Sequence, residues 1–158
     1  MRFQDQAVRM THRALDDIVR SARAVPQDRL DWVPMGFSRS VLSQMREIAA
    51  AGRWFLPILR DREAPEFDSH AAREAARIRR GFKTLDQCVD AARANTSALC
   101  EAIEELADEH LDDELHLPFG GGVTLSLADV AMLHHNNMVY HLGQINQLQL
   151  MLGDREMH

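Results

Sequence analysis

Three polar side chains near the C-terminus, those of His134, Asn137 and His141, have the spacing of one face of a helix. They lie three and four positions apart. The other residues at this spacing are mainly apolar: Leu127, Val130, Gln144 or Ile145, Leu148 and Leu152. The face therefore points to the core, where an unpartnered polar group costs roughly 1–3 kcal/mol. These residues need a hydrogen bond, a metal ion or a ligand.

The elements that must position these residues are long helices. The last helix has clear end signals, because Ser126 is a suitable N-cap and Gly153 follows the last apolar residue. Ser38 or Ser40 would cap a second helix, in which Glu47 lies beside the apolar face. A glutamate in that place is by default exposed or ion-paired. Apolar spacing predicts four long helices, near residues 2–25, 38–60, 84–108 and 125–152, and a short one over residues 71–82.

The segments between these helices are long enough for crossover connections. Residues 61–70 are acidic and turn-like, and residues 108–123 predict a short extended excursion with a glycine-rich turn. Residues 26–37 predict a packed connector with three buried-looking side chains, Leu30, Trp32 and Phe37. No strand alternation of comparable length is visible. We predict one domain over residues 1–158, an all-α four-helix bundle with long crossover connections.

The composition excludes several functional classes. The chain is 46% hydrophobic and 27% charged, as in an ordinary globular protein. A net charge of −6 argues against nucleic acid as a partner, because phosphate binding needs a basic face. Five basic residues cluster locally, a pattern more typical of a solvated helix face than of an anion site: Arg73, Arg77, Arg79, Arg80 and Lys83.

The two cysteines, Cys88 and Cys100, are expected in one helix. Their Cα atoms would be about 18 Å apart, beyond the ~7 Å reach of a disulfide. We expect reduced core cysteines and a cytoplasmic location. The N-terminal residues lack an apolar signal segment, and no stretch approaches the ~18 apolar residues of a membrane helix, so neither secretion nor membrane spanning is expected.

A family resemblance is carried by two runs of sequence, LDWVPMGFSRSVLSQMREIAAAGRWF and NNMVYHLGQINQLQLMLGD. The second run contains Tyr140-His141-Leu142-Gly143-Gln144-Ile145, which is similar to the terminal H-x-G-Q signature of the DinB-like family. Members are described as damage-inducible proteins or metal-dependent hydrolases. The resemblance extends over nearly the whole chain and implies a four-helix bundle.

The resemblance also implies a site. In the family, a histidine of the second helix and two histidines of the last helix commonly bind zinc or nickel. The matching positions here are Glu47, Asn137 and His141, so only the last retains histidine. Asparagine offers a neutral carbonyl oxygen, which is a poor zinc ligand. His134 is an alternative ligand, yet it lies about 10.5 Å along the helix axis from His141.

Three interpretations of this pocket stay open, the last of which is an arrangement unrelated to the site of the family. In the first, Glu47, Asn137 and His141 hydrogen-bond one another without a metal, and the network fixes the helix register. In the second, the same residues hold a weakly bound divalent metal, zinc or nickel. The remaining histidines have no mutual spacing that suggests ligation: His12, His70, His110, His116 and His158.

Three functions match these interpretations. We favour a bundle whose polar network is structural or binds a small-molecule ligand. A metal-dependent hydrolase or small-thiol transferase or isomerase is the first alternative, since a bound metal activates water or a thiol at neutral pH. A structural or stress-associated dimer is the second. We expect a homodimer because the last helix has many apolar residues outside its core stripe: Met132, Leu133, Met138, Val139, Leu142, Leu150 and Met151.

Overall fold

The computed structural model describes residues 1–66 and 68–158. The long helices are α1 (Phe3–Ala24), α2 (Val41–Asp61), α4 (Leu85–Glu104) and α5 (Leu127–Met151), and the shorter α3 (Ser69–Gly81) lies between α2 and α4 in the chain. The predicted all-α bundle is confirmed, and each long helix begins and ends within four residues of its predicted bounds.

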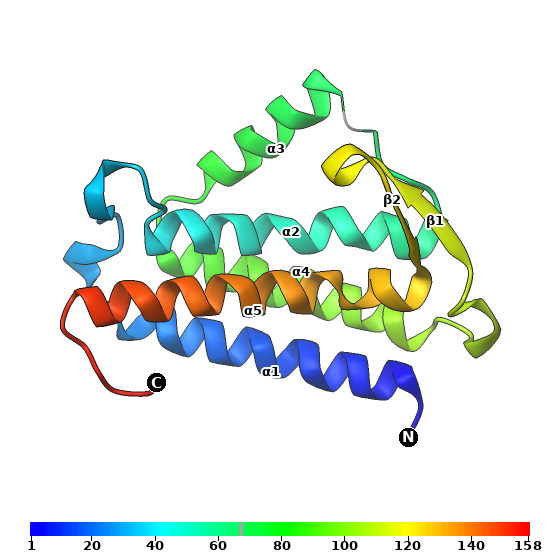
Figure 1. Ribbon diagram of the computed structural model, residues 1–158, viewed down its shortest axis with the longest axis horizontal. Coiled ribbons are helices and arrows are strands. Elements are labelled where there is room, and N and C mark those ends of the chain that lie inside the picture. Colours follow the sequence, from blue (N-terminus) through cyan, green and yellow to red (C-terminus); the bar gives the residue numbers. More distant parts are fainter. Residues whose placement is uncertain (67) are drawn as a thin grey trace.

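The four long helices form two parallel pairs. Helix α1 packs beside α5 and helix α2 beside α4, and contacts of α1 with α4 and of α2 with α5 close the bundle. The colours of Figure 1 show that α1 and α5 run in one direction while α2 and α4 run in the other. Parallel neighbours need a long connection, which α3 and its flanking residues supply between α2 and α4. The topology is therefore not a simple up-down-up-down bundle.

Local chemistry fixes the ends of these helices. The Ser126 hydroxyl accepts from the backbone N–H of Asp129, and the Asp129 carboxylate accepts from the Ser126 N–H, a reciprocal cap. Thr84 and Gln87 cap α4 in the same way. The apolar stripes between the caps meet in the interior, where Ile48, Leu99 and Ile145 are among the fully buried side chains. Within the described residues, no helix is both long and apolar enough to cross a bilayer.

The excursion predicted for residues 108–123 begins a short hairpin that extends to Ser126, past the predicted start of the last helix at residue 125. A single-turn helix, η3 (Asp108–His110), precedes strand β1 (Glu114–Leu117), which pairs antiparallel with β2 (Val123–Ser126). The strands are joined by Pro118, η4 (Phe119–Gly121) and Gly122. Gly122 has a φ of +100°, a backbone conformation that favours glycine.

The connector between α1 and α2 differs from the prediction in one respect. It consists of two single turns, η1 (Gln27–Arg29) and η2 (Pro34–Gly36). Leu30 is buried and Trp32 packs against the core, but the Phe37 side chain is 88% exposed. The expectation that Phe37 is buried is wrong, because positive φ values at Met35 and Gly36 turn the chain away from the bundle.

Three other expectations can be compared with the structure. Cys88 and Cys100 are free and buried as predicted, and burial raises their thiol pKa values to about 11 and about 12. The predicted turn of residues 61–70 contains Phe67, which lies outside the described residues. Of the α5 residues expected to be surplus to the core, Met138 is fully buried, and the exposed ones are Val139, Leu150 and Met151.

Candidate functional site

Glu47 and His141 meet between α2 and α5. The imidazole Nε2 of His141 lies 3.2 Å from Oε1 of Glu47. His141 is only 1% exposed, whereas 32% of the Glu47 side chain reaches solvent. The pair therefore joins the core to the surface of the bundle. His141 lies on the core-facing stripe predicted for the last helix, and Glu47 lies beside the apolar face of α2 and is ion-paired.

Two carboxamides hold the other side of the imidazole. The Nδ1 of His141 lies 3.1 Å from Oε1 of Gln44 and 3.0 Å from Oε1 of Gln144. These carbonyl oxygens can only accept, so Nδ1 carries the hydrogen and donates it. Nε2 then faces the Glu47 carboxylate, and that contact is favourable when a proton or another cation lies between the two atoms.

Arg39 extends the Glu47–His141 pair to a row of three hydrogen-bonded side chains. Its Nη1 lies 2.6 Å from Oε2 of Glu47, so each carboxylate oxygen has a partner. The pKa of Glu47 is lowered, mainly by the hydrogen bond from His141 and further by the charges of His141, Arg39 and Arg79, while burial opposes the shift. Glu47 is therefore ionised at neutral pH.

Asn137 lies one turn before His141 on α5 but does not share its hydrogen bonds. Its Oδ1 is buried and has no hydrogen-bond partner among the described residues. The network expected among Glu47, Asn137 and His141 thus forms between Glu47 and His141, with Arg39 and the two glutamines in place of Asn137. An unpartnered buried carbonyl costs free energy that a suitable donor can recover.

His134 has a different environment from His141. Its side chain is fully buried, with Nε2 2.9 Å from the Thr96 hydroxyl and the ring 6.1 Å from that of Phe55. Its Nδ1 has no partner within the part of the chain that the structure describes. Burial, and then the charge of His135, lower the pKa of His134 to about 4. His134 is thus a neutral core residue between α4 and α5.

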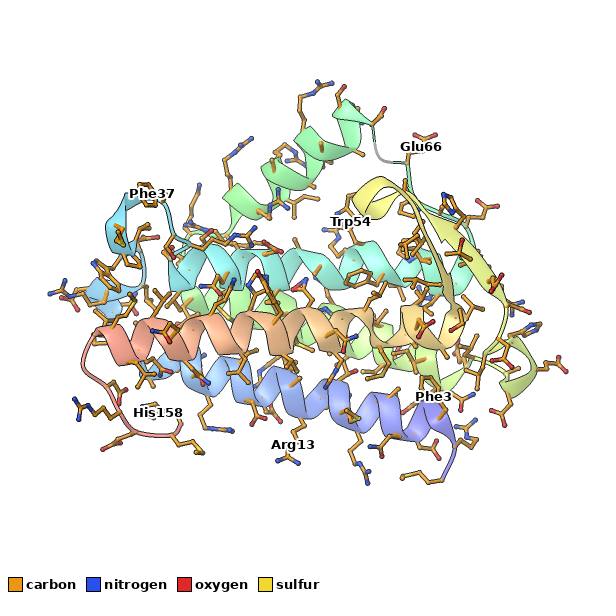
Figure 2. All side chains as sticks on the ribbon, in the orientation of Figure 1. Phe3, Arg13, Phe37, Trp54, Glu66 and His158 are labelled. Carbon is orange, nitrogen blue, oxygen red and sulfur yellow. The ribbon has the colours of Figure 1, made fainter. Side chains whose placement is uncertain are left out.

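Two cavities adjoin Glu47 and Asn137. One, of about 400 Å³, lies between α2 and α3, and Arg79 of α3 contributes to its wall. The other, of about 510 Å³, lies between α2, α5 and β2. Glu47, Phe55 and Asn137 line both, whereas His134 is not among the described residues that line either. Figure 2 shows Trp54, which also lines the first cavity, in the space between α2 and α3.

The donors present do not fit a tightly held zinc or nickel ion. Among the described residues, no three His, Cys, Asp or Glu side chains converge on one point. Glu47 and His141 supply two good donors, and Asn137 adds only a neutral oxygen. The Arg39 guanidinium, bonded to the second oxygen of Glu47, places positive charge where it opposes a divalent cation.

The sequence reasoning missed three members of this network. Gln44 precedes Glu47 by three positions, and Gln144 follows His141 by three. Residues at this spacing share a helix face, so the signal was available for both glutamines. Arg39 falls within the helix predicted near residues 38–60, but in the structure it lies before Ser40, the N-cap of α2, and outside the apolar stripe. Its position depends on the connector and could not be predicted from periodicity.

The fold and this site define a class of protein, a helical bundle with a polar pair between two antiparallel helices, one member buried and the other partly exposed, and cavities beside it. The family profile of the DinB superfamily matches residues 10–145, and the chain belongs to this superfamily. No curated protein sequence is significantly similar to the chain.

Solved structures with the same fold have low sequence identity to this chain. A DinB-like protein of Bacillus subtilis, YjoA, superposes with a TM-score of 0.68 at 17% identity, covering 97% of this chain and 95% of its own. A mycothiol-dependent maleylpyruvate isomerase gives 0.65 at 12% identity, with 92% of this chain matched to 63% of the isomerase. A histidine-to-alanine mutant of that isomerase gives the same score at 14% identity and the same coverage. At sequence identities this low, the similarity shows a shared fold alone.

Proposed function

We propose that the protein is a small-molecule-binding member of the DinB superfamily whose Glu47–His141 pair acts without a metal. The observation that carries this proposal is the buried, unpartnered Oδ1 of Asn137, a residue that lines both cavities beside the pair. A ligand with a hydrogen-bond donor can satisfy this amide, after a small rotation of the side chain, and gain the free energy that is otherwise lost.

The walls of the cavities indicate the kind of ligand. Trp54 and Phe55 supply flat apolar surfaces, and Ala50, Ala51 and Ala75 leave the space beside them open. Volumes of several hundred Å³ are typical of sites for small organic molecules. We therefore expect an apolar, partly planar ligand with one hydroxyl or amide N–H directed to Asn137. The hydrogen-bonded row of Arg39, Glu47 and His141 would keep the polar wall of the site rigid.

A change of Asn137 to leucine tests this proposal. In a fragment screen followed by NMR, ligands that shift the Asn137 side-chain amide should bind at least about tenfold more weakly to Asn137→Leu, since roughly 1.4 kcal/mol of hydrogen bonding is lost. Asn146→Leu makes the same change on α5 outside both cavities and should bind as the parent does. Unchanged binding to Asn137→Leu would contradict the proposal that the ligand bonds to Asn137.

A metal-dependent hydrolase or thiol transferase is the second candidate. The 3.2 Å between Nε2 of His141 and Oε1 of Glu47 is close to the ~3.3 Å expected between two ligands of one tetrahedral ion with bonds of about 2.0–2.1 Å. The name of one similar structure, a mycothiol-dependent isomerase, agrees with thiol chemistry in that protein. Here Glu47 and His141 would hold zinc or nickel weakly, beside Asn137.

Metal analysis separates the two candidates. Protein purified without an affinity tag should contain no stoichiometric zinc or nickel, and a stoichiometric ion would favour the second candidate. Asn137→His creates a pair of histidines four residues apart, so calorimetry should record a clear gain in affinity for either ion. Failure of this variant to gain affinity would show that positions 47, 137 and 141 do not face a common cavity.

We also propose that the protein is a cytoplasmic homodimer. Val139 and Leu150 expose large apolar side chains on one face of α5, and neither lines a cavity beside Glu47. Burial of such a surface against a second copy would stabilise a dimer. Light scattering at tens of micromolar should give the mass of two chains. A monomeric mass at that concentration would contradict the proposal.

A further inference from the structure

A third cavity, of about 660 Å³, lies between α5 and the turn of residues 34–38. It adjoins the network at His141, because Arg39, Gln44 and Gln144 line it and also bond to Glu47 or His141. Asn137 does not line it, so it differs from the two cavities of the proposed function.

Gly143 forms part of its wall and has no evident structural role there. The residue lies in the interior of α5, where glycine weakens a helix relative to alanine. No described atom lies within 4 Å of the position that a Cβ would occupy, so packing does not require glycine. The missing side chain leaves the cavity open. A destabilising residue with this effect is expected where a ligand needs the space.

The polar lining has a distinct chemistry. Gln44, Gln144 and Gln147 contribute three carboxamides and Arg39 one guanidinium. None of the described lining residues is acidic, although the chain contains 24 aspartates and glutamates. Gln44 is buried, with its Oε1 bonded to His141 and its Nε2 to the Arg39 carbonyl, so Gln144 and Gln147 are the carboxamides open to a ligand. Carboxamides donate and accept, as an amide ligand requires, and the guanidinium has donors beyond the one bonded to Glu47. The lining is therefore complementary to an amide next to a carboxylate.

The mouth of the cavity is apolar. Met35 and Phe37 line it and are 82% and 88% exposed. Figure 2 shows Phe37 on the turn at the end of the bundle where α2 begins. Met35 has a φ of 56°, an uncommon conformation for a residue with a side chain, in a turn that presents both side chains outward. Flexible methionine side chains adapt to apolar groups of varied shape.

We propose that this third cavity binds an N-acylated amino acid with an apolar or thioether side chain. The carboxylate would bind Arg39, the amide would bind Gln144 and Gln147, and the side chain would contact Met35 and Phe37. Because Arg39, Gln44 and Gln144 also hold Glu47 and His141, binding here alters the surroundings of that pair. The proposal does not depend on Asn137.

NMR titration with N-acetyl-L-methionine tests the proposal on the full chain. The backbone amides of Gly143 and Gln147 should shift and saturate at millimolar ligand. The methyl ester of the same compound lacks the carboxylate and should bind at least about tenfold more weakly. The absence of saturable shifts with the acid, or equal binding of the ester, would overturn the proposal.

Gly143→Gln supplies the decisive variant. The longer side chain fills the cavity and should weaken binding at least about tenfold, while its better helix propensity raises Tm by about 2 °C. Gly81→Gln, at the end of α3 and also in open space, should leave binding unchanged. Parent-like affinity in a folded Gly143→Gln protein would contradict the proposal. Asn137→Leu should bind N-acetyl-L-methionine as the parent does, so the two proposed sites can fail separately.

Discussion

Two histidines on one face of α5 have opposite environments. His134 and His141 are seven residues apart and almost equally buried. His134 bonds to the hydroxyl of Thr96 in an apolar part of the bundle, whereas His141 bonds to a carboxylate and two carboxamides. Equal burial therefore does not give two histidines the same hydrogen-bond partners. The groups on the facing helices, α4 for His134 and α2 for His141, decide them.

The two histidines also differ in their suitability for a functional site, because only His141 is linked to the surface and to the cavities. Among the described residues His134 has no charged partner to offset its burial, which lowers its pKa to about 4 and keeps it neutral. His141 is linked through Glu47 and Arg39 to the protein surface and to the cavities. The four changes below test the two environments in order of decreasing expected effect.

Loss of the His141 ring should have the largest effect. His141→Ala leaves Gln44, Gln144 and Glu47 without their shared partner and opens a cavity, so unfolding in urea should show a loss of about 3 kcal/mol. In the metal-free network, this loss is the same with zinc or with a chelator. His12→Ala, on the exposed side of α1, should cost less than about 0.5 kcal/mol.

Acid should destabilise the folded protein by protonating His134. Its folded pKa of about 4 lies below the ordinary value of 6.5, so between these values the unfolded chain binds a proton that the folded chain does not. The stability from neutral His134 is complete above pH 6.5 and falls by about 1.4 kcal/mol per pH unit below it, or roughly 2 kcal/mol at pH 5. The difference between the parent and His134→Leu isolates this effect. A pH-independent difference would show that His134 is not held neutral.

Thr96→Val tests the bond that defines the environment of His134. Valine keeps the shape of threonine but leaves Nε2 of a buried ring without a partner, which should cost roughly 1–2 kcal/mol. Thr11→Val is the matched control, because the Thr11 hydroxyl is buried and already has no partner among the described residues. That change should be neutral or stabilising. Equal losses in the two variants would mean that the Thr96 bond contributes nothing.

Glu47→Gln should have the smallest effect, about 0.5–1 kcal/mol at pH 7, because the Glu47 side chain is partly exposed and its ion pairs are screened. The pKa of this carboxyl is lowered in the folded state. Its contribution is therefore present above the ordinary value of 4.5 and is lost as the pH falls below it. Denaturant curves of parent and variant should converge in that acidic range. A loss above 2 kcal/mol would show that the charge matters more than its exposure suggests.

The sequence by itself determined the helices and the seam that carries the polar residues. Caps such as Ser126 with Asp129, and the apolar stripes between them, are local features that depend on residues within one or two turns. The same periodicity placed His141 on the core-facing stripe of the last helix, because a regular helix fixes the direction of each side chain. It placed Glu47 only beside the apolar face of its helix, and the pairing of Glu47 with His141 was an implication of the family resemblance.

Only the tertiary structure decided which groups the two histidines meet. The rotation and offset of α2 against α5 bring Gln44 and Glu47 to His141, and the packing of α4 brings Thr96 to His134. The path of the connector determines that Arg39 reaches Glu47 and that Phe37 is exposed. These contacts join residues far apart in the chain. Periodicity within one helix contains no information about the position of its neighbour, so only the folded bundle determines them.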